Sequence, residues 1–329
     1  MVPNIGPGRP IHHSYAKVWP SVRLCADIRP WPYIRSMPLT RTRKCPQCDQ
    51  LDSRPIAPLA EHHLVRCRNC GLVYTGWEPT EQELMDYYAH YPAPAAISPI
   101  TIQRYDELLM RFAPYRKTGR LFEVGCGAGH FLERARSHGW EVQGNEYGEL
   151  TLRACRERGI PVAEGELDPG AHEIGGYDIV CSFEVIEHVI HPRTEVRNML
   201  ALLRPGGLLY LTTPNYNCLA RRAAPESWSI ASYPEHLNYF TPRTLNKLVQ
   251  SQGAREKWIT TTGVSVERWR TKRTRDPGVR AAARAEQEDL RARMETETSM
   301  KILKRAANSV LDLLKVGDSM KACFEKPHP

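Results

Sequence analysis

The sequence predicts an α/β fold with a mainly parallel sheet, preceded by a small domain held together by four cysteines. Three observations lead to this prediction. From residue 100 onward, amphipathic helical segments alternate with short apolar segments, which is typical of a parallel sheet covered by helices. A glycine-rich turn follows the first apolar segment. Two Cys-x-x-Cys pairs stand ahead of the alternating region.

Length and composition indicate a globular protein. A chain of 329 residues accommodates two modest domains or one decorated domain. Its 41% hydrophobic and 25% charged residues are typical of a soluble protein, and no apolar run reaches the ~18 residues that a membrane span needs. The N-terminus lacks the apolar stretch of a secretory signal, so we expect a cytoplasmic protein without a membrane span.

The basic charge of the chain is concentrated at its start. Residues 1–44 hold eight Lys or Arg and one Asp, a charge of +7 out of a total of +8, so the remainder carries only +1. A near-neutral remainder argues against nucleic acid as a partner. We expect residues 1–40 to form a disordered basic leader, since they carry seven prolines and no hydrophobic period. A second basic run, from Arg268 to Arg275, is interpreted as a solvated linker.

Residues 41–78 are predicted to form a zinc ribbon. The four thiolates of two Cys-x-x-Cys knuckles suit a structural tetrahedral site and leave no open position for a substrate. Gly71 permits the left-handed turn that closes the second knuckle. A redox pair and a nucleic-acid-binding ribbon are the functional alternatives, and His62 and His63 are possible substitute ligands. The predicted ligands are Cys45, Cys48, Cys67 and Cys70.

Residues 79–99 are predicted to be a tyrosine-rich helix and a linker. Thr80 followed by Glu83 three positions later forms a capping pattern at the helix start. Tyr87, Tyr88 and Tyr91 either pack or line a pocket. Prolines beyond them mark the linker.

The first strand and turn of the core, residues 100–262, predict a binding loop. An amphipathic helix over 102–112 precedes a buried strand over 121–124, and a helix over 130–138 follows the turn. Glycines at such a strand-to-helix turn let the backbone approach a ligand closely. His130 stands where the dinucleotide fingerprint has Gly or Ala, so the loop favours a ligand smaller than NAD. The loop residues are Gly125, Cys126, Gly127 and Gly129.

A carboxylate after the second strand completes the predicted nucleoside site. The strand over 140–144 leads into Glu146, which lies 21 residues after Gly125 and is placed to accept hydrogen bonds from both ribose hydroxyls. The alternative role for Glu146 is a carboxylate at a helix start. We include the adjacent Tyr147 in the predicted cofactor set.

These segments resemble the class I S-adenosylmethionine-dependent methyltransferases. The resemblance implies a Rossmann-like sheet of seven strands, the last two near Glu256–Thr261 and Lys321–Glu325. It further implies that Glu123 and the glycine loop surround the methionine moiety, that Glu166 and Leu167 border the adenine, and that Phe183 lies beneath the cofactor. The motifs that carry it are Glu123 to Gly129, Glu146, Tyr177 to Cys181, Glu184 to His188, and Leu203 to Gly207.

Residues 263–318 are predicted to be a linker and a helical insertion before the last strand and tail, residues 319–329. A charged helix is expected near 279–297. The helix that follows carries an apolar stripe, interpreted as packing or as a lid over the acceptor site. The stripe consists of Met300, Leu303, Ala307, Val310, Leu311 and Leu314.

Methyl transfer to a hydroxyl or an acidic carbon needs alignment and a base. His188 and His236 both follow strands and titrate near neutrality, so either is a candidate base. The ribbon followed by Tyr233, Glu235 and His236 resembles the zinc-containing sugar C-methyltransferases, which implies that these three side chains face the acceptor. The same core resembles quinone and phenol O-methyltransferases, in which the segment of His188 borders the acceptor.

The predicted function is therefore methyl transfer from S-adenosylmethionine to a small molecule, namely a sugar, a glycan precursor or a phenolic or quinone compound, with a structural zinc ion. An RNA methyltransferase is one alternative, although Ser182 and Phe183 stand where an Asn/Asp-Pro-Pro-Tyr segment would be expected. A non-catalytic scaffold that retains the cofactor pocket is another. A nicotinamide oxidoreductase is disfavoured by His130. The acceptor and the oligomeric state stay open.

Overall fold

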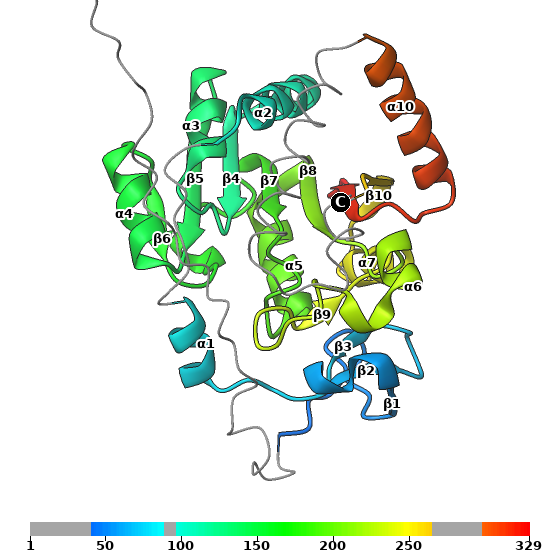
Figure 1. Cartoon of the computed structure of the whole chain (residues 1–329). Coiled ribbons are helices and arrows are strands. Elements are labelled where there is room, and N and C mark those ends of the chain that lie inside the picture. Colours follow the sequence, from blue (N-terminus) through cyan, green and yellow to red (C-terminus); the bar gives the residue numbers. More distant parts are fainter. Residues whose placement is uncertain (1–40, 89–96, 265–297) are drawn as a thin grey trace, which may run out of the picture. The chain divides into compact units, whose positions relative to one another are not determined.

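Two sheets organise the part of the chain that the structure describes, one of seven strands and one of four. The computed structural model describes residues 41–88, 97–264 and 298–329, all within the unit Leu39–Pro329 (Figure 1). The basic leader, Tyr91, the basic run after Arg268 and the helix expected near 279–297 lie outside the described residues. None of the described helices has the length and apolar character that crossing a membrane requires.

The seven-stranded sheet confirms the predicted Rossmann-like architecture. Its order is β10-β11-β8-β7-β4-β5-β6. Strands β8, β7, β4, β5 and β6 are parallel to one another, whereas β11 is antiparallel to its neighbours β8 and β10. The last two strands lie where the resemblance placed them. The strands are β4 (Arg120–Val124), β5 (Glu141–Glu146), β6 (Val162–Glu164), β7 (Tyr177–Phe183), β8 (Leu203–Pro214), β10 (Arg255–Thr262) and β11 (Ser319–Glu325).

Helices cover both faces of this sheet because its strands are apolar on both sides. Leu121 and Ile179 face one cluster, which includes α2, α3 and α4, whereas Phe122 and Val180 face another, which includes α5 and α7. The helices are α1 (Glu81–Tyr88), α2 (Pro99–Phe112), α3 (His130–Ser137), α4 (Glu149–Glu157), α5 (Pro192–Leu202), α6 (Leu219–Ala223), α7 (Pro242–Gln250) and α10 (Thr298–Leu313). Short 3₁₀ turns are η2 (Ala57–His62), η3 (Ala113–Tyr115), η4 (Pro169–Ala171) and η5 (Pro225–Ser227).

Local capping sets several helix starts. Helix α2 begins at Pro99, three residues before the predicted start, because the Ser98 hydroxyl accepts a hydrogen bond from the Thr101 amide at 3.3 Å. The capping pattern predicted at α1 is confirmed. There, the Thr80 amide donates to Glu83 Oε2 at 2.7 Å and the Glu83 amide donates to Thr80 Oγ1 at 3.2 Å.

The four-stranded sheet combines the ribbon with a strand from the core. Its order is β1-β2-β3-β9, and the partners that join the two regions are Val73 with Tyr239 and Tyr74 with Asn238. The first three strands follow one another within the ribbon, whereas β9 comes after β8 of the large sheet. The strands are β1 (Ser53–Pro55), β2 (Leu64–Cys67), β3 (Val73–Thr75) and β9 (Asn238–Tyr239).

Helix α10 contacts the edge strand β10 through polar groups. The Thr261 amide donates to Asp312 Oδ1 at 2.8 Å, and the Gly263 amide donates to Asn308 Oδ1 at 3.0 Å. The predicted packing stripe is therefore wrong in part: Leu311 is buried, but Leu303, Val310 and Leu314 are 60%, 55% and 61% exposed. Polar side chains of the helix face the end of the strand because the amides of Thr261 in β10 and of Gly263 just after it need acceptors.

Candidate functional site

The glycine loop between β4 and α3 packs tightly at its ends and is open at its centre. All three glycines have positive φ, and a Cβ at Gly125 would lie 2.6 Å from Val185 Cγ2. A Cβ at Gly129 would lie 2.9 Å from the Cys155 sulfur. At Gly127 nothing lies within 4 Å of the Cβ position among the described residues. The loop thus needs glycine to form, and its middle residue borders free space that a ligand can enter.

Glu146 at the carboxyl end of β5 holds this loop. Its Oε2 accepts a hydrogen bond from the Gly127 amide at 2.7 Å. Its Oε1 accepts from the amides of Tyr147 and Gly148 at 2.9 and 3.0 Å. A carboxylate has about four acceptor positions, so it retains capacity for a further donor such as a ribose hydroxyl. The binding role of Glu146 stays a prediction, as does that of Tyr147, a residue that is 52% exposed.

Glu123 on β4 is a buried carboxyl with an unsatisfied oxygen. The residue is 4% exposed, and its Oε2 has no hydrogen-bond partner among the described residues. Burial, followed by the nearby Cys155 and Glu146, raises the pKa of Glu123 well above its usual value. A buried acid in this state suits a ligand that brings a positive charge, because the charge would satisfy the open oxygen. The ammonium group of a methionine moiety has that chemistry.

Aromatic side chains gather where β7 ends. The Phe183 ring lies 4.9 Å from the Phe131 ring and 5.7 Å from the Tyr210 ring, centroid to centroid. Tyr105 of α2 adds a third contact at 6.2 Å. Farther along, Leu167 is buried and Glu166 is exposed. These positions are compatible with the adenine and cofactor contacts expected for Phe183, Glu166 and Leu167, which stay predictions.

Cys126 of the loop lies against Cys155 of α4. Their sulfurs are 3.8 Å apart, and the Cys155 thiol donates to the Gly127 carbonyl at 3.1 Å. Both side chains are buried. This environment indicates that Cys126 packs under the loop and does not act as a nucleophile.

The segment after β7 carries a buried carboxyl next to the predicted acceptor side. Glu187 is 2% exposed; its Oε2 accepts a hydrogen bond from the Thr213 hydroxyl at 2.9 Å, and its Oε1 has no partner among the described residues. Burial, with a contribution from Glu184, raises the pKa of Glu187 well above its usual value. Because Val185 of the same segment contacts Gly125, the carboxyl belongs to a segment that packs on the cofactor loop.

The two histidines predicted as alternative bases are in contact. Their ring centroids are 4.7 Å apart, and His188 Nε2 lies 3.9 Å from Glu187 Oε1. His188 Nδ1 is 2.8 Å from the Glu235 carbonyl, and His236 Nδ1 is 2.6 Å from the Ile230 carbonyl. Since a carbonyl only accepts, each Nδ1 carries the proton and each Nε2 is an acceptor. Burial, followed by His236, lowers the pKa of His188 to about 4.

Tyr233, three residues before His236, contacts the ribbon. The Tyr233 hydroxyl is buried without a partner in the described structure, and burial, with Glu83 second, raises the pKa of Tyr233 to about 12. Its ring makes an edge contact with His63 at 5.4 Å, and His63 stacks on Trp77 at 4.2 Å. His63 is therefore part of an aromatic stack, and the described cluster of metal-ligating groups in the ribbon does not include it or His62.

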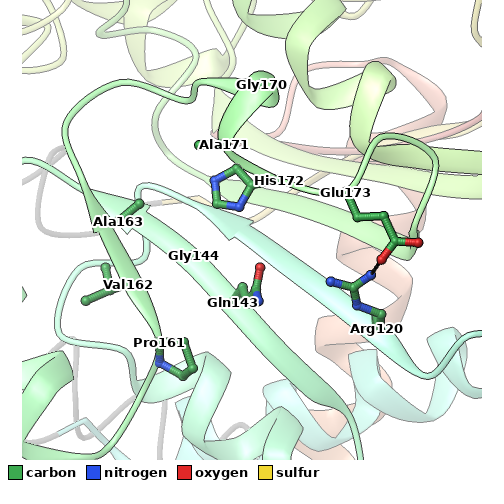
Figure 2. A pocket seen from close by; sticks show the side chains of 10 residues that line it. All are labelled: Arg120, Gln143, Gly144, Pro161, Val162, Ala163, Gly170, Ala171, His172 and Glu173. Carbon is green, nitrogen blue, oxygen red and sulfur yellow. Dashed lines mark hydrogen bonds and ion pairs between the residues drawn. The ribbon is translucent and has the colours of Figure 1, made fainter.

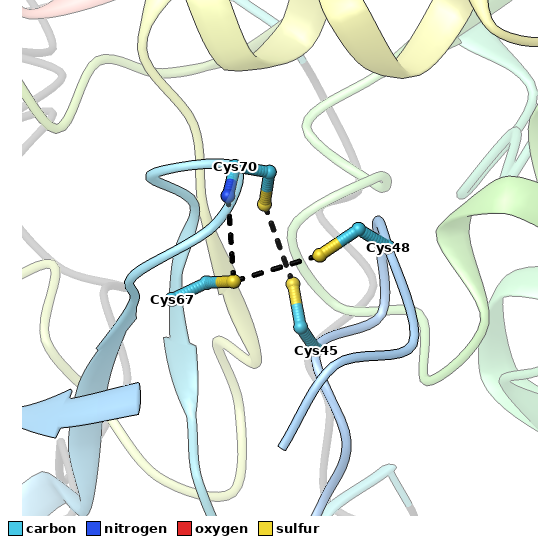
Figure 3. A group of neighbouring side chains, drawn as sticks. All are labelled: Cys45, Cys48, Cys67 and Cys70. Carbon is cyan, nitrogen blue, oxygen red and sulfur yellow. Dashed lines mark hydrogen bonds between the residues drawn. The ribbon is translucent and has the colours of Figure 1, made fainter. Parts of the chain in front are cut away.

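The four ribbon cysteines converge as predicted (Figure 3). All four sulfurs lie within 4.8 Å of one another, with 3.5 Å between Cys45 and Cys70 and between Cys48 and Cys67. A tetrahedron with ~2.3 Å zinc–sulfur bonds has sulfurs about 3.8 Å apart, so the set fits zinc. The left-handed turn predicted at Gly71 is confirmed with φ +83°, and Asp49 has φ +59° after the first knuckle.

A separate cavity of about 550 Å³ lies beside β4, β5 and β6 (Figure 2). None of the predicted site residues lines it. Its walls come from the starts and middles of these strands, whereas ligands of parallel sheets bind at the carboxyl ends. We therefore do not assign it to the cofactor. The lining residues are Arg120, Gln143, Gly144, Pro161, Val162, Ala163, Gly170, Ala171, His172 and Glu173.

Four residues of the site were not predicted from the sequence. Glu187 belongs to the Glu184 to His188 motif, and its position next to the candidate base His188 could have identified it as a site residue. Thr213, Asn238 and Arg43 carry no sequence signal, because their roles depend on partners far along the chain.

Comparisons with known proteins agree on one family. Residues 99–287, more than half of the chain, match the family model described as a methyltransferase domain. The Ubiquinone biosynthesis O-methyltransferase of Bordetella avium (strain 197N) is 33% identical over 129 residues, which cover 37% of this chain and 52% of that protein. The protein of the same name from Proteus mirabilis (strain HI4320) is 32% identical over 127 residues, covering 35% and 52%. The chain thus spans about half the length of these curated relatives.

Solved structures of the same general fold are also similar. A SAM dependent methyltransferase from Archaeoglobus fulgidus has a TM-score of 0.46 at 16% identity, and the match covers 75% of this chain and 100% of that chain. A putative sarcosine dimethylglycine methyltransferase from Galdieria sulphuraria has a TM-score of 0.46 at 13% identity, covering 69% and 85%.

Proposed function

Since this chain belongs to the methyltransferase domain family, we propose that it transfers the methyl group of S-adenosylmethionine to a small-molecule acceptor. The observation that carries the proposal is the pairing of an open glycine loop with two acidic side chains. Glu146 accepts a hydrogen bond from the Gly127 amide of the loop, and Glu123 presents a buried oxygen that has no partner among the described residues. One carboxylate suits ribose hydroxyls and the other suits an ammonium group, and S-adenosylmethionine carries both.

The acceptor in this proposal presents a hydroxyl to the histidine pair. When bound, S-adenosylmethionine supplies a methyl group on a positively charged sulfur. His236 accepts the hydroxyl proton at Nε2 while the oxygen takes the methyl group. His188 is the weaker candidate base, because its pKa is lowered to about 4 by burial and by His236. In the proposal His188 orients the acceptor, and the Tyr233 hydroxyl, which has no partner in the described part of the chain, donates a hydrogen bond to it.

A phenolic or quinone-like compound is the acceptor class that we favour. Two relatives that share about a third of their aligned residues with this chain are named Ubiquinone biosynthesis O-methyltransferase, and such reactions methylate oxygen. The aromatic surroundings of Tyr233 support a ring-shaped acceptor. A sugar is the second class, supported by the combination of ribbon, Tyr233 and Glu235.

We also propose that the ribbon holds one structural zinc ion. Four cysteine sulfurs within bonding range of one point leave no position for a substrate, so the ion would stabilise the fold and take no part in methyl transfer.

Calorimetric titration tests the cofactor assignment. The zinc-loaded protein is titrated with S-adenosylmethionine and with its demethylated product, and the titration is repeated with Glu146→Ala. Glu164→Ala is the matched control, because Glu164 pairs with Glu146 on the neighbouring strand but is exposed. We expect micromolar binding to wild type and control, and a Kd at least ~10-fold higher for Glu146→Ala, since hydrogen bonds to a charged group contribute ~1.5–3 kcal/mol.

The result also separates an enzyme from a scaffold. Wild-type protein that does not bind either compound would refute the proposal. Wild-type protein that binds S-adenosylmethionine, yet releases no demethylated product with any phenolic, quinone or sugar acceptor, would favour a non-catalytic role.

A further inference from the structure

Arg43 is a buried cation that stands between the ribbon and the histidine pair. It precedes the zinc ligand Cys45 by two residues and is only 4% exposed. Its amide donates to the Gly76 carbonyl at 2.8 Å, which fixes its backbone within the ribbon. A buried guanidinium requires hydrogen-bond acceptors for its N–H groups. The residues that accept these bonds therefore identify the segments that Arg43 joins.

The partners of this guanidinium belong to the two histidine segments. Arg43 Nη1 donates to the Leu237 carbonyl at 3.0 Å, and Nη2 donates to the Ile190 carbonyl and to Asn238 Oδ1. Leu237 directly follows His236, and Ile190 comes two residues after His188. One side chain of the ribbon therefore ties together the backbones that carry both imidazoles.

A second set of bonds makes the arrangement rigid. The amides of Leu237 and Asn238 both donate to the Glu187 carbonyl, at 2.8 and 2.9 Å. The Asn238 amide side chain donates to the carbonyls of Ile186 and Val189 at 3.1 and 2.7 Å. Removing the guanidinium would take one donor from each of the Ile190 and Leu237 carbonyls at the point where the segments meet, and the Leu237 carbonyl would keep the Thr75 amide.

The ribbon sheet reaches the same point. Tyr74 of β3 pairs with Asn238, and the Thr75 amide donates to the Leu237 carbonyl at 3.0 Å. Strand β3 follows the second knuckle of the ribbon directly, so a change in the metal site is carried to Leu237 by two routes, through β3 and through Arg43. The glycine loop takes part in neither route.

We infer that Arg43 is a positioning residue that couples the zinc ribbon to the geometry of the His188 and His236 pair, through hydrogen bonds that do not include the glycine loop. The importance of this coupling for methyl transfer rests on the proposed function; the coupling itself does not. Lysine at this position has one charged nitrogen, which reaches fewer of the three acceptors than a guanidinium does. A partial effect of Arg43→Lys and a full effect of Arg43→Ala are therefore expected.

The test follows the imidazoles directly. Zinc-loaded full-length protein carrying ¹⁵N-labelled histidine is observed by NMR, and the signals of the pair are assigned with His188→Gln and His236→Gln. Arg43→Ala, Arg43→Lys and the control Arg68→Ala are compared with wild type. Arg68 adjoins the proposed ligand Cys67, but its side chain is 62% exposed and its Nε lies 3.4 Å from Asp52 Oδ1. Each variant is also titrated with S-adenosylmethionine.

The expected result is selective. Arg43→Ala shifts or broadens the His188 and His236 signals, Arg43→Lys does so less, and Arg68→Ala leaves them unchanged, whereas the Kd for S-adenosylmethionine stays within twofold throughout. Removing zinc from wild type with a chelator produces the same change, and this arm tests the coupling even where Arg43→Ala does not fold. Unmoved histidine signals in Arg43→Lys and in zinc-free protein would overturn the inference. Moved signals in a protein that never binds S-adenosylmethionine would refute the proposed function alone.

Discussion

Replacing Gly125 by alanine tests how the cofactor loop is built. Two costs add at this position. Gly125 has φ +66°, a left-handed conformation that costs an alanine ~1–2 kcal/mol. The new Cβ would also lie 2.6 Å from Val185 Cγ2, and overpacking of this kind costs ~1–3 kcal/mol. We therefore expect Gly125→Ala to lower the free energy of unfolding by ~2–5 kcal/mol.

Gly127→Ala is the matched control two residues away. Its φ of +53° imposes a similar backbone cost, but nothing described lies within 4 Å of its Cβ position. We expect a loss of only ~1–2 kcal/mol of unfolding free energy. The added methyl group occupies the open space of the loop, so Gly127→Ala is expected to weaken S-adenosylmethionine binding more than it weakens the fold.

Urea denaturation measures the backbone and packing contributions to the free energy of unfolding. It is applied to Gly125→Ala, Gly127→Ala, Val185→Ala and the double variant Gly125→Ala/Val185→Ala. Truncating Val185 removes the atom that clashes, so the double variant is expected to regain ~1–3 kcal/mol relative to the sum of the two single changes. Equal stability of Gly125→Ala and Gly127→Ala, together with additive effects in the double variant, would refute the packing argument.

Three further predictions concern single side chains. Asp178, which is buried, accepts hydrogen bonds from Arg204 and three amides that lower its pKa, so Asp178→Asn is expected to cost ~3–5 kcal/mol at neutral pH. Because the wild-type advantage is lost as pH falls below ~4, denaturation curves at pH 3 and pH 7 should show a shrinking difference, and a constant one would contradict the assignment. Glu123→Gln is expected to change stability with pH in the opposite direction. Burial raises the pKa of Glu123, so the wild-type protein loses stability as pH rises above ~4.3. The variant is therefore expected to be more stable than wild type at pH 7, yet to bind S-adenosylmethionine more weakly. Tyr233→Phe removes a hydroxyl without a described partner, so its melting temperature is expected to match wild type while acceptor turnover falls; a marked loss of stability would show an unrecognised partner.

Local patterns were sufficient to predict most of the fold. Strand and helix periods, the glycine turn and the two cysteine knuckles each depend on residues close in sequence, and the last two strands lie where the resemblance placed them. The apolar stripe of α10 misled the prediction, because Asn308 and Asp312 on its other side satisfy the amides of β10. A hydrophobic period shows which side of a helix is apolar, but it does not show which backbone amides of a neighbouring strand require hydrogen-bond acceptors.

The candidate site was predictable residue by residue and not as an assembly. His188 and His236 were named separately, yet their contact depends on hydrogen bonds from Leu237 and Asn238 to Glu187. Arg43 could not be recognised, since its acceptor at Leu237 is 194 residues away along the chain. An arginine ahead of a cysteine knuckle is ordinarily a surface residue, and only its burial distinguishes it.

The late strand β9 has a consequence for how the protein is made. The four cysteines emerge from the ribosome long before Leu237 and Asn238, which complete the ribbon sheet and satisfy Arg43. At roughly 5–20 residues per second, a separation of 194 residues corresponds to a delay of about 10–40 s. For most of that interval, once Cys70 has emerged, the nascent ribbon has its four cysteines but not its fourth strand. Capture of the proposed zinc ion can therefore precede completion of the sheet, and a fragment ending before β9 would contain all four cysteines without the fourth strand.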